Sequence, residues 1–372
     1  MRFLFAGAQM KALILSTHTG GGHDAAAFAV REALEARGVQ CRVMDSVAFG
    51  GERLTRLVSR TYIRMAVRTP ALFGRVYRIG DAVRHSPFPS PVYLANASYA
   101  GRLADAVERY APDMVVCTHL YAGQSMTWVR RHRGYPGLLA MVMTDYTFIP
   151  FSEEVRADLF FVGHRDMLSE CGRIGVDGGK VRVTGIPVSR VCVRRAYRPS
   201  FPRRVVLAGG SIGAGNLPAA VRQLRECLPP DVRLQVVAGD NEQARKEAEA
   251  AARGDGRIEV FGRVTPLSQL VCGADLLITK SGGLTTTEAM VMGTPMLIYG
   301  AIEGCETINA ALLERHGLAA WARNAQELAS KLLALLEDDE ARMRMTRRQV
   351  EEIPGSPADL CAEELLKEAG KG

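Results

Sequence analysis

A histidine that could accept a proton stands beside three glycines near the start of the chain. The stretch THTGGGHDAAA, residues 17–27, follows a short apolar run and leads into an alanine-rich segment of helical composition. This order predicts a helix whose first turn holds His23, and the helix dipole there disfavours a protonated imidazole. A neutral imidazole can act as a general base, so we predict that His23 is catalytic. The alternative is a histidine that only caps or packs.

Two glycine turns in the second half have the composition of anion-binding loops. AGGSIGAGN occupies residues 208–216 and TKSGGLTTTEA occupies residues 279–289, each at the end of an apolar run. Glycines let backbone N–H groups approach an anion closely, and a following helix adds partial positive charge. We interpret the first turn as a diphosphate cradle, although it lacks the lysine of a Walker A loop. The alternative is a tight strand-to-helix turn without a ligand.

Acidic and amide side chains accompany these turns. Glu288 follows the second turn and could accept two hydrogen bonds from a ribose diol. Alternatively, Thr285 caps the helix and Glu288 is its capping-box partner. A third loop, AIEGCETINAAL at residues 301–312, adds Glu306 and Asn309. Three loops that converge on one rim suit a nucleotide-sugar, and we predict such a site in the second half.

Alternating strands and helices must position these residues. The predicted strands are KALILST, QCRVMDS, DMVVCTH, LLAMVMTD, ADLFFVG, VRVTGIP, RVVLAGG, RLQVVAG, RIEVFG, DLLITK and PMLIYG. Short apolar strands that alternate with helices are typical of parallel sheets covered on both faces. We therefore predict an α/β fold of two doubly wound, Rossmann-like domains that face a central cleft. Ligands in such folds bind beyond the carboxyl ends of the strands.

The composition is that of an ordinary soluble protein. Of the 372 residues, 47% are hydrophobic and 23% are charged, and no apolar run is long enough to span a bilayer. The eight cysteines lack the CxxC spacing of metal and redox sites. This pattern predicts reduced cysteines, a cytosolic location and no zinc site.

A basic segment lies in the first half. Residues 52–84 hold eight arginines and only two acids, while the net charge of the whole chain is +7. Five arginines recur every three or four residues, within an arc of about 120° on a helix: Arg53, Arg56, Arg60, Arg64 and Arg68. With Phe73 and Tyr77 they predict contact with an anionic membrane surface. The alternatives are a solvated helix face or arginines paired with acids. Nucleic acid is not predicted as a partner, because no recognisable binding module accompanies the charge.

A proline- and arginine-rich stretch, residues 187–204, separates the two series of strands and indicates a linker. We predict a membrane-binding domain over residues 1–190, a linker over 191–204 and a nucleotide-sugar-binding domain over 205–352. The remaining segment, 353–372, is predicted to form a helix that packs back on the N-terminal domain.

Taken together, the motifs resemble those of the diacylglycerol glycosyltransferases, the group that contains plant monogalactosyldiacylglycerol synthases and bacterial processive diacylglycerol glucosyltransferases. The resemblance covers about residues 11–365, and the matching stretches are LSTHTGGGHDAAA, VMTDYTFIPF, VTGIPV, AGGSIGAGN, ITKSGGLTTTEAMVMGTPMLIY and EGCETINA. It implies a GT-B fold, a UDP-sugar donor bound in the C-terminal domain, and inversion at the anomeric carbon with no metal and no cofactor.

The resemblance also implies roles for individual residues. His23 would activate the acceptor hydroxyl, Asp145 would stand beside it in the cleft, and Gly20, Gly21 and Gly22 would form the loop at the acceptor or phosphate. The implied donor-binding residues are Gly210, Ser211, Gly213, Val264, Lys280, Gly282, Gly283, Thr285, Glu288, Cys305, Glu306 and Asn309. Two positions depart from the family pattern. Pro150 stands where many relatives have a histidine, and Cys305 stands where many have a glutamine.

The predicted function is transfer of a hexose, glucose or galactose, from a UDP-sugar to the hydroxyl of diacylglycerol at the inner face of the cell membrane. One alternative is a transferase or 2-epimerase that uses UDP-N-acetylglucosamine; an epimerase needs no bilayer, so the basic segment argues against it. The other is a non-catalytic lipid- or nucleotide-binding module, which the presence of His23 and Glu288 disfavours.

Overall fold

The structure is a computed structural model that describes residues 9–18, 21–51, 78–81, 88–210, 213, 216–353 and 355–370. The predicted site residues outside the described residues are Gly20, Ser211, Arg53, Arg56, Arg60, Arg64, Arg68, Phe73 and Tyr77.

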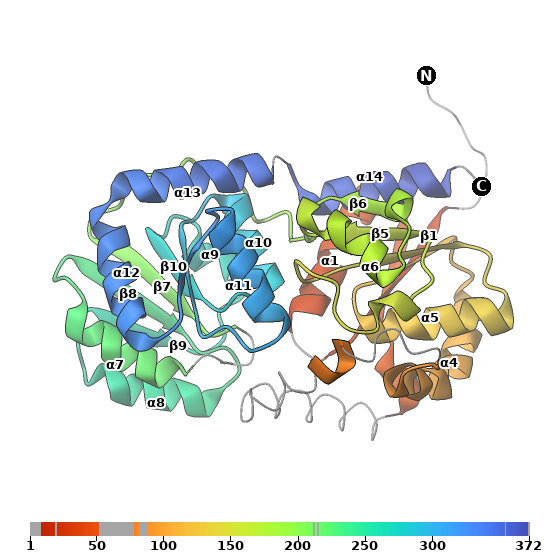
Figure 1. The fold of residues 1–372 in the computed structure, drawn as a ribbon, viewed down its shortest axis with the longest axis horizontal. Helices are drawn as coiled ribbons and strands as arrows, with labels where there is room; N and C mark the ends of the chain where they lie inside the picture. The colour runs from red at the N-terminus through yellow and green to blue at the C-terminus, as the bar shows by residue number, and fades with distance from the viewer. Residues whose placement is uncertain are drawn as a thin grey trace.

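Two parallel six-stranded sheets organise the described chain (Figure 1). The first has the order β2-β1-β3-β4-β5-β6 and the second β12-β11-β10-β7-β8-β9. The strands of the first sheet are β1 (Lys11–Ser16), β2 (Gln40–Asp45), β3 (Met114–Cys117), β4 (Leu138–Val142), β5 (Leu159–Val162) and β6 (Val181–Val183). Those of the second are β7 (Arg203–Ala208), β8 (Val232–Val237), β9 (Ile258–Phe261), β10 (Leu276–Thr279), β11 (Met296–Tyr299) and β12 (Ala320–Ala322). All eleven predicted strands are confirmed, whereas β12 lies outside the prediction.

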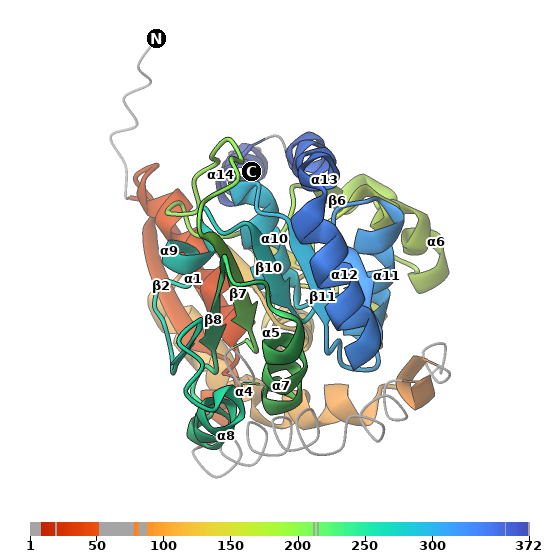
Figure 2. The ribbon, with the colours of Figure 1, turned by 90° about the vertical axis from the view of Figure 1, so that its left-hand side faces the viewer.

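Helices cover both sheets. Those of the first half are α1 (Gly21–Glu35), α4 (Pro91–Tyr110), α5 (Leu120–Arg133) and α6 (Cys171–Ile174), with short 3-10 turns η1 (Val47–Gly50), η2 (Ser152–Glu154), η3 (Arg165–Glu170) and η4 (Gly178–Lys180). Those of the second half are α7 (Leu217–Cys227), α8 (Glu242–Ala252), α9 (Ser268–Val271), α10 (Gly283–Met292), α11 (Cys305–Arg315), α12 (Ala325–Glu337) and α13 (Asp339–Glu352). Figure 2 looks onto this second half, with α7 and α8 below the strands and α13 above them.

The central strand β1 shows why the apolar runs of the sequence are continuous. Leu13 and Leu15 pack in one buried cluster with Leu103 of α4. Ala12 and Ile14 pack in another cluster, on the side of α1. Since successive strand side chains point to opposite faces, a central parallel strand with helices on both sides must be apolar throughout. The doubly wound architecture predicted from the sequence is confirmed.

The C-terminal helix α14 (Pro357–Ala369) packs on α1 of the first half, as Figure 1 also shows. Cys361 and Leu365 are fully buried in the cluster on this side of the first sheet. Arg37 follows α1 and reaches Asp359 at 2.6 Å and Glu363 at 2.8 Å. The chain therefore returns to the first half after the second sheet is complete, while the exact domain limits stay a prediction.

We expect Leu365→Ala to lower the free energy of unfolding by about 2–5 kcal/mol, because it leaves a cavity in a fully buried cluster. Leu360 of the same helix is 37% exposed, so Leu360→Ala is the matched control and should change stability by less than about 0.5 kcal/mol. Urea unfolding of both variants measures the difference. Equal effects at the two positions would contradict the docking of α14.

The remaining sequence expectations concern thiols and membrane spans. All eight cysteines are free thiols, and Cys117, Cys171, Cys192 and Cys361 are buried. Among the described helices, none combines the length and the apolar character that crossing a bilayer requires.

Candidate active site between the two sheets

His23 lies in the first turn of α1, as predicted. Its Nδ1 is 2.8 Å from the Thr118 carbonyl oxygen and 3.0 Å from the Thr144 hydroxyl. The Thr118 hydroxyl in turn donates to the His23 carbonyl at 3.0 Å. A carbonyl oxygen only accepts hydrogen bonds, so Nδ1 carries the hydrogen in the neutral ring and Nε2 keeps the lone pair. Residues at the ends of β3 and β4 thus set the tautomer that a general base needs.

The protonation state of His23 also suits a base. Burial lowers the pKa of His23, and the Thr118 carbonyl and the charge of Asp145 only partly oppose this effect. His119 packs edge-on against His23, with ring centroids 4.4 Å apart, and burial and His23 lower the pKa of His119 well below its usual value. His119, Thr118 and Thr144 were not among the site residues predicted from the sequence. All three stand at the ends of predicted strands, which is the signal that could have found them.

Asp145 connects the predicted catalytic pair to the donor half. The Asn309 side chain donates to Asp145 Oδ1 at 2.8 Å and to the Ser281 carbonyl at 3.0 Å. Its own carbonyl oxygen accepts from the backbone N–H of Tyr146 at 2.9 Å. Burial raises the pKa of Asp145, and the Asn309 amide and His23 act in the opposite direction. Two residues predicted from separate motifs, in different halves of the chain, are therefore in direct contact.

Lys280 and Glu306 form an ion pair on the donor side of the site. Glu306 also accepts from the Ile302 N–H at 3.0 Å, and its carbonyl accepts from the Ser281 hydroxyl at 2.5 Å. Burial disfavours the charged lysine, but the carboxylate of Glu306 outweighs it and leaves the pKa of Lys280 raised. Burial, with the charges of Asp145 and Glu306, raises the pKa of Cys305 well above its usual value. The thiol of Cys305 is therefore neutral at physiological pH.

The first glycine turn reaches the same lysine. Gly210 has φ +70°, a conformation that side chains rarely adopt, and a Cβ there would lie 2.9 Å from Cε of Lys280. On the acceptor side, a Cβ on Gly22 would lie 3.7 Å from Leu284 of α10, while Gly21 is the exposed first residue of α1. The structure thus brings the start of α1 close to the start of α10, and Gly210 close to Lys280.

Some predicted residues remain apart from this group. Gly213 lies against Ala238 and Asn241 of the loop after β8. Val264 is half-buried in the loop after β9. Thr285 is half-buried within α10.

Glu288 lies in the middle of α10 and not in a capping box. The helix begins at Gly283 with Gly282 as its N-cap and without a side-chain cap, so the alternative that Thr285 caps it is wrong. No hydrogen-bond or ion-pair partner of the Glu288 carboxyl lies within the described residues. Burial raises the pKa of Glu288 to about 7. An acid held in such an environment costs stability and is a candidate for function.

We expect Glu288→Gln to stabilise the protein at pH 8 and not at pH 4.5. The folded-state pKa of about 7 exceeds the ordinary value of 4.5, so ionisation is penalised increasingly as the pH rises between these values and fully above pH 7. After allowance for partial exposure of the side chain, we expect the free energy of unfolding of Glu288→Gln at pH 8 to exceed that of the wild type by about 1–2 kcal/mol. Thermal unfolding at both pH values measures it. Equal stability of the two proteins at pH 8 would contradict a folded-state penalty on ionisation of Glu288.

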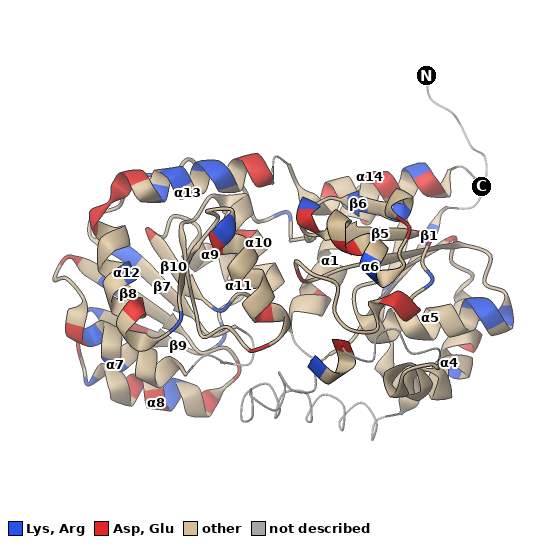
Figure 3. Ribbon diagram, in the orientation of Figure 1, with Lys and Arg blue, Asp and Glu red and all other residues tan. Residues whose placement is uncertain are grey.

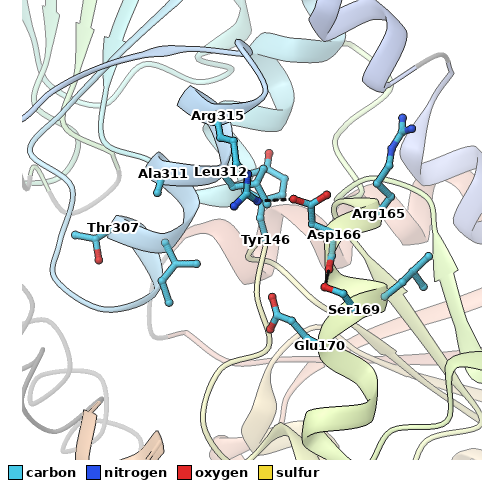
Figure 4. A pocket seen from close by; sticks show the side chains of 11 residues that line it. Tyr146, Arg165, Asp166, Ser169, Glu170, Thr307, Ala311, Leu312 and Arg315 are labelled. Carbon is cyan, nitrogen blue, oxygen red and sulfur yellow. Dashed lines mark hydrogen bonds and ion pairs between the residues drawn. The ribbon is translucent and has the colours of Figure 1, made fainter.

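A cavity of about 800 Å³ lies between η3 of the first half and α11 of the second (Figure 4). Thr307, Ile308, Ala311 and Arg315 line it from α11. Glu306 and Asn309 stand on the opposite face of that helix, because residues one and two positions apart diverge by 100° and 200° around an α-helix. No predicted site residue lines the cavity, but Tyr146, which follows Asp145 in the chain, borders it, so the cavity adjoins the candidate active site.

Among the described residues, His164, Asp166 and His316 are the group whose ligand atoms lie close enough for a metal ion, within 4.8 Å of one another. Their hydrogen bonds argue against that use. Nδ1 of His164 accepts from the Asp166 N–H at 3.1 Å, so Nε2 carries the hydrogen and lies 3.2 Å from Glu352 Oε1. Asp166 is also paired with Arg315. Neither nitrogen of His164 offers a free lone pair to a metal.

Two family models match the chain in succession. Residues 23–188 match the model described as monogalactosyldiacylglycerol (MGDG) synthase, and residues 205–338 match the model described as glycosyl transferases group 1. A relative, the processive diacylglycerol beta-glucosyltransferase of Bacillus subtilis (strain 168), is 24% identical over 371 residues. That match covers 96% of this chain and 95% of the relative.

Solved structures share the fold at lower identity. MurG of Acinetobacter baumannii is 16% identical with a TM-score of 0.65, over 96% of this chain and 99% of that one. A putative UDP-N-acetylglucosamine 2-epimerase from Listeria monocytogenes is 17% identical with a TM-score of 0.63, over 97% and 95% of the two chains. The predicted two-domain GT-B fold is confirmed.

Proposed function

We propose that this chain, which belongs to the diacylglycerol glycosyltransferase family, transfers glucose or galactose from a UDP-sugar to the hydroxyl of diacylglycerol. The observation that carries the proposal is the contact between the predicted catalytic residues of the first half and a donor-side residue of the second half. A histidine held in the neutral, Nδ1–H form lies in the electrostatic field of Asp145, and Asp145 is bound by Asn309 of the donor half. Such a pair can remove a proton beside a sugar donor.

His23 acts as the general base of this reaction. As the acceptor oxygen attacks the anomeric carbon, its proton passes to Nε2 of His23. The bond between the anomeric carbon and the diphosphate oxygen breaks, and UDP leaves with the electron pair. Attack from the opposite face inverts the anomeric centre. Asp145 stabilises the imidazolium that forms, because an opposite charge nearby favours the protonated ring.

The donor half holds the UDP-sugar and stabilises its leaving group. Backbone N–H groups of the Gly210 turn and the N-terminus of α10 favour the negative charge that develops on the diphosphate. Lys280 adds a positive charge directly beside Gly210. Glu288 accepts hydrogen bonds from the ribose hydroxyls, while Glu306 and Asn309 border the sugar. The protein's own groups supply the charge stabilisation in this account, and we expect no metal requirement.

The acceptor reaches the enzyme at an anionic membrane surface. The segment with eight arginines and two acids, residues 52–84, supplies the positive charge. Three large apolar side chains in or shortly after this segment of the sequence are strongly exposed: Ile79 at 63%, Phe88 at 77% and Leu94 at 57%. Exposed apolar side chains beside a basic segment suit an interfacial membrane contact. In α13 the arginines stand between acidic residues at both ends of the helix (Figure 3). Residues 52–84, where eight arginines face only two acids in the sequence, are our candidate for a peripheral attachment to the inner face of the cell membrane.

Product formation with three donors tests the proposal. The protein is incubated with diacylglycerol in anionic vesicles and with UDP-glucose, UDP-galactose or UDP-N-acetylglucosamine, and glycolipid and UDP are measured by mass spectrometry. We expect glycolipid and UDP in equal amounts with one of the two hexose donors. An epimerised UDP-sugar without glycolipid would establish the 2-epimerase alternative instead. Binding of UDP-sugars without any turnover would indicate a non-catalytic module.

A further inference from the structure

The segment after β4, residues 144–146, contacts the catalytic histidine and the donor half at the same time. The Thr144 hydroxyl is 3.0 Å from Nδ1 of His23, as described above. The main chain of Thr144 faces the other way, onto the start of α10. The chain therefore passes between the two halves with one residue in contact with both.

The contact with α10 is so close that it requires glycine. A Cβ placed on Gly283, the first residue of α10, would lie 2.1 Å from the Thr144 carbonyl oxygen and 2.6 Å from Cδ1 of Ile186. Real Cβ atoms do not approach oxygen to this distance, so any side chain at Gly283 would push α10 away from Thr144. The absence of a side chain is what lets the donor-domain helix sit against the β4 loop.

Tyr146 fixes the same segment to the donor half. Its hydroxyl lies 2.7 Å from the Thr287 hydroxyl and 3.2 Å from the Thr286 hydroxyl, both in α10. Its backbone N–H donates to Asn309 of α11 at 2.9 Å. Tyr146 is 1% exposed. The position of Thr144 therefore depends on the position of α10 and α11.

We propose that Thr144 is a positioning residue that couples the packing of donor-domain helix α10 to the orientation of the His23 ring, a role that presupposes the proposed transfer reaction. The Thr118 carbonyl and the Thr144 hydroxyl both accept from Nδ1–H, and together they fix the ring in its plane. Thr118 belongs wholly to the first half, whereas Thr144 is in place only when α10 packs on it. The His23 ring is therefore held by both acceptors only when α10 packs against Thr144.

Replacement of Thr144 by valine removes the hydroxyl and keeps the shape of the side chain. We expect kcat of Thr144→Val to fall by about 10- to 100-fold, while KM for the donor changes by less than about threefold, because the base is misplaced and donor contacts are kept. Thr144→Ser should recover most of the activity. Thr147 is the matched control: it lies in the same loop and is buried, but its hydroxyl donates to Glu170. Thr147→Val should keep the wild-type pH profile.

The pH profile separates positioning from simple loss of structure. The titratable groups that face His23 are Asp24 of its own helix, His119 after β3 and Asp145 after β4. An acceptor at Nδ1 stabilises the imidazolium more than the neutral ring, so its loss lowers the pKa of His23. The acid limb of kcat/KM should therefore move to lower pH in Thr144→Val and return in Thr144→Ser. An unchanged acid limb in the valine variant would overturn the role of Thr144.

Gly283→Ala tests the coupling from the donor side. Nitrogen-15 NMR of labelled histidine in the full chain reports which ring nitrogen of His23 carries the hydrogen, and it needs no catalytic activity. We expect the Nδ1–H form in the wild type, and in Gly283→Ala and Thr144→Val a shifted Nδ1 resonance, because the Thr144 acceptor is displaced or lost while the Thr118 carbonyl remains. Gly101→Ala is the control, since a Cβ there meets no atom within 4 Å. If Gly283→Ala keeps the wild-type His23 signal, the coupling is wrong; if the signals change as expected but no glycolipid forms, only the proposed function fails.

Discussion

Replacement of His23 by alanine lowers kcat by about 10²- to 10⁴-fold, the range that general-base catalysis contributes. The reason is the loss of Nε2, the one imidazole nitrogen that the Thr118 carbonyl leaves with a lone pair. Binding of UDP should change by less than about threefold, because catalytic groups that act in the transition state contribute little to ground-state binding. Steady-state kinetics and calorimetric binding of UDP measure the two effects separately.

Replacement of a second histidine, which lies away from the site, is the control for His23→Ala. His132 stands in the last turn of α5, stacks on Trp128 and contacts the Trp128 carbonyl at 2.9 Å. His132→Ala should keep the wild-type kcat. Full activity of His23→Ala would remove the basis for His23 as the base and would favour a different proton acceptor, with Asp145 the next candidate.

The second large expected effect is a loss of stability when the Lys280–Glu306 ion pair is broken. Lys280→Met leaves the Glu306 carboxylate unpaired at a position where its side chain is only 10% exposed. Removal of one partner of a buried ion pair typically costs 3–5 kcal/mol, and we expect about 3 kcal/mol here because some solvent reaches both groups. Urea unfolding of the variant and the wild type measures the cost. Donor binding should weaken as well, since Lys280 is our proposed contact to the diphosphate.

The double variant Lys280→Met/Glu306→Gln distinguishes the two roles of the lysine. Without the charged carboxylate, the methionine no longer leaves a buried charge unpaired, so most of the lost stability should return. Donor binding should not return, because neither replacement supplies a positive charge. Recovery of both properties in the double variant would mean that Lys280 serves only to neutralise Glu306.

The fold could be predicted from the sequence because its signals are local. The central strands, such as β3, β4, β5 and β10, are runs of apolar residues bounded by turn residues, and burial on both faces requires such runs. β12 lacks this signal. It consists of Ala320, Trp321 and Ala322, and alanine favours strands weakly, so only pairing with β11 makes the segment a strand.

The site was predictable only in part, for a similar reason. His23, Lys280, Glu288 and Glu306 stand in or close to glycine-containing stretches that the sequence displays. The partners that tune them are distant in the chain: Thr144 reaches His23 across 121 residues, and Asn309 reaches Asp145 across 164. Such contacts depend on how the two sheets pack together, which no local pattern encodes. The packing of α14 on α1 also joins distant parts of the chain, through the buried face of α14.

The anomeric configuration of the product tests the central claim most directly, since attack assisted by His23 from the face opposite UDP must invert the sugar. The glycolipid formed from an α-linked UDP-hexose and diacylglycerol is isolated, and the proton coupling at its anomeric carbon is measured by NMR. The account predicts a β-linked hexose on the glycerol hydroxyl. An α-linked product would contradict the proposed displacement, and a UDP-sugar changed at C2 without glycolipid would contradict the transfer reaction itself.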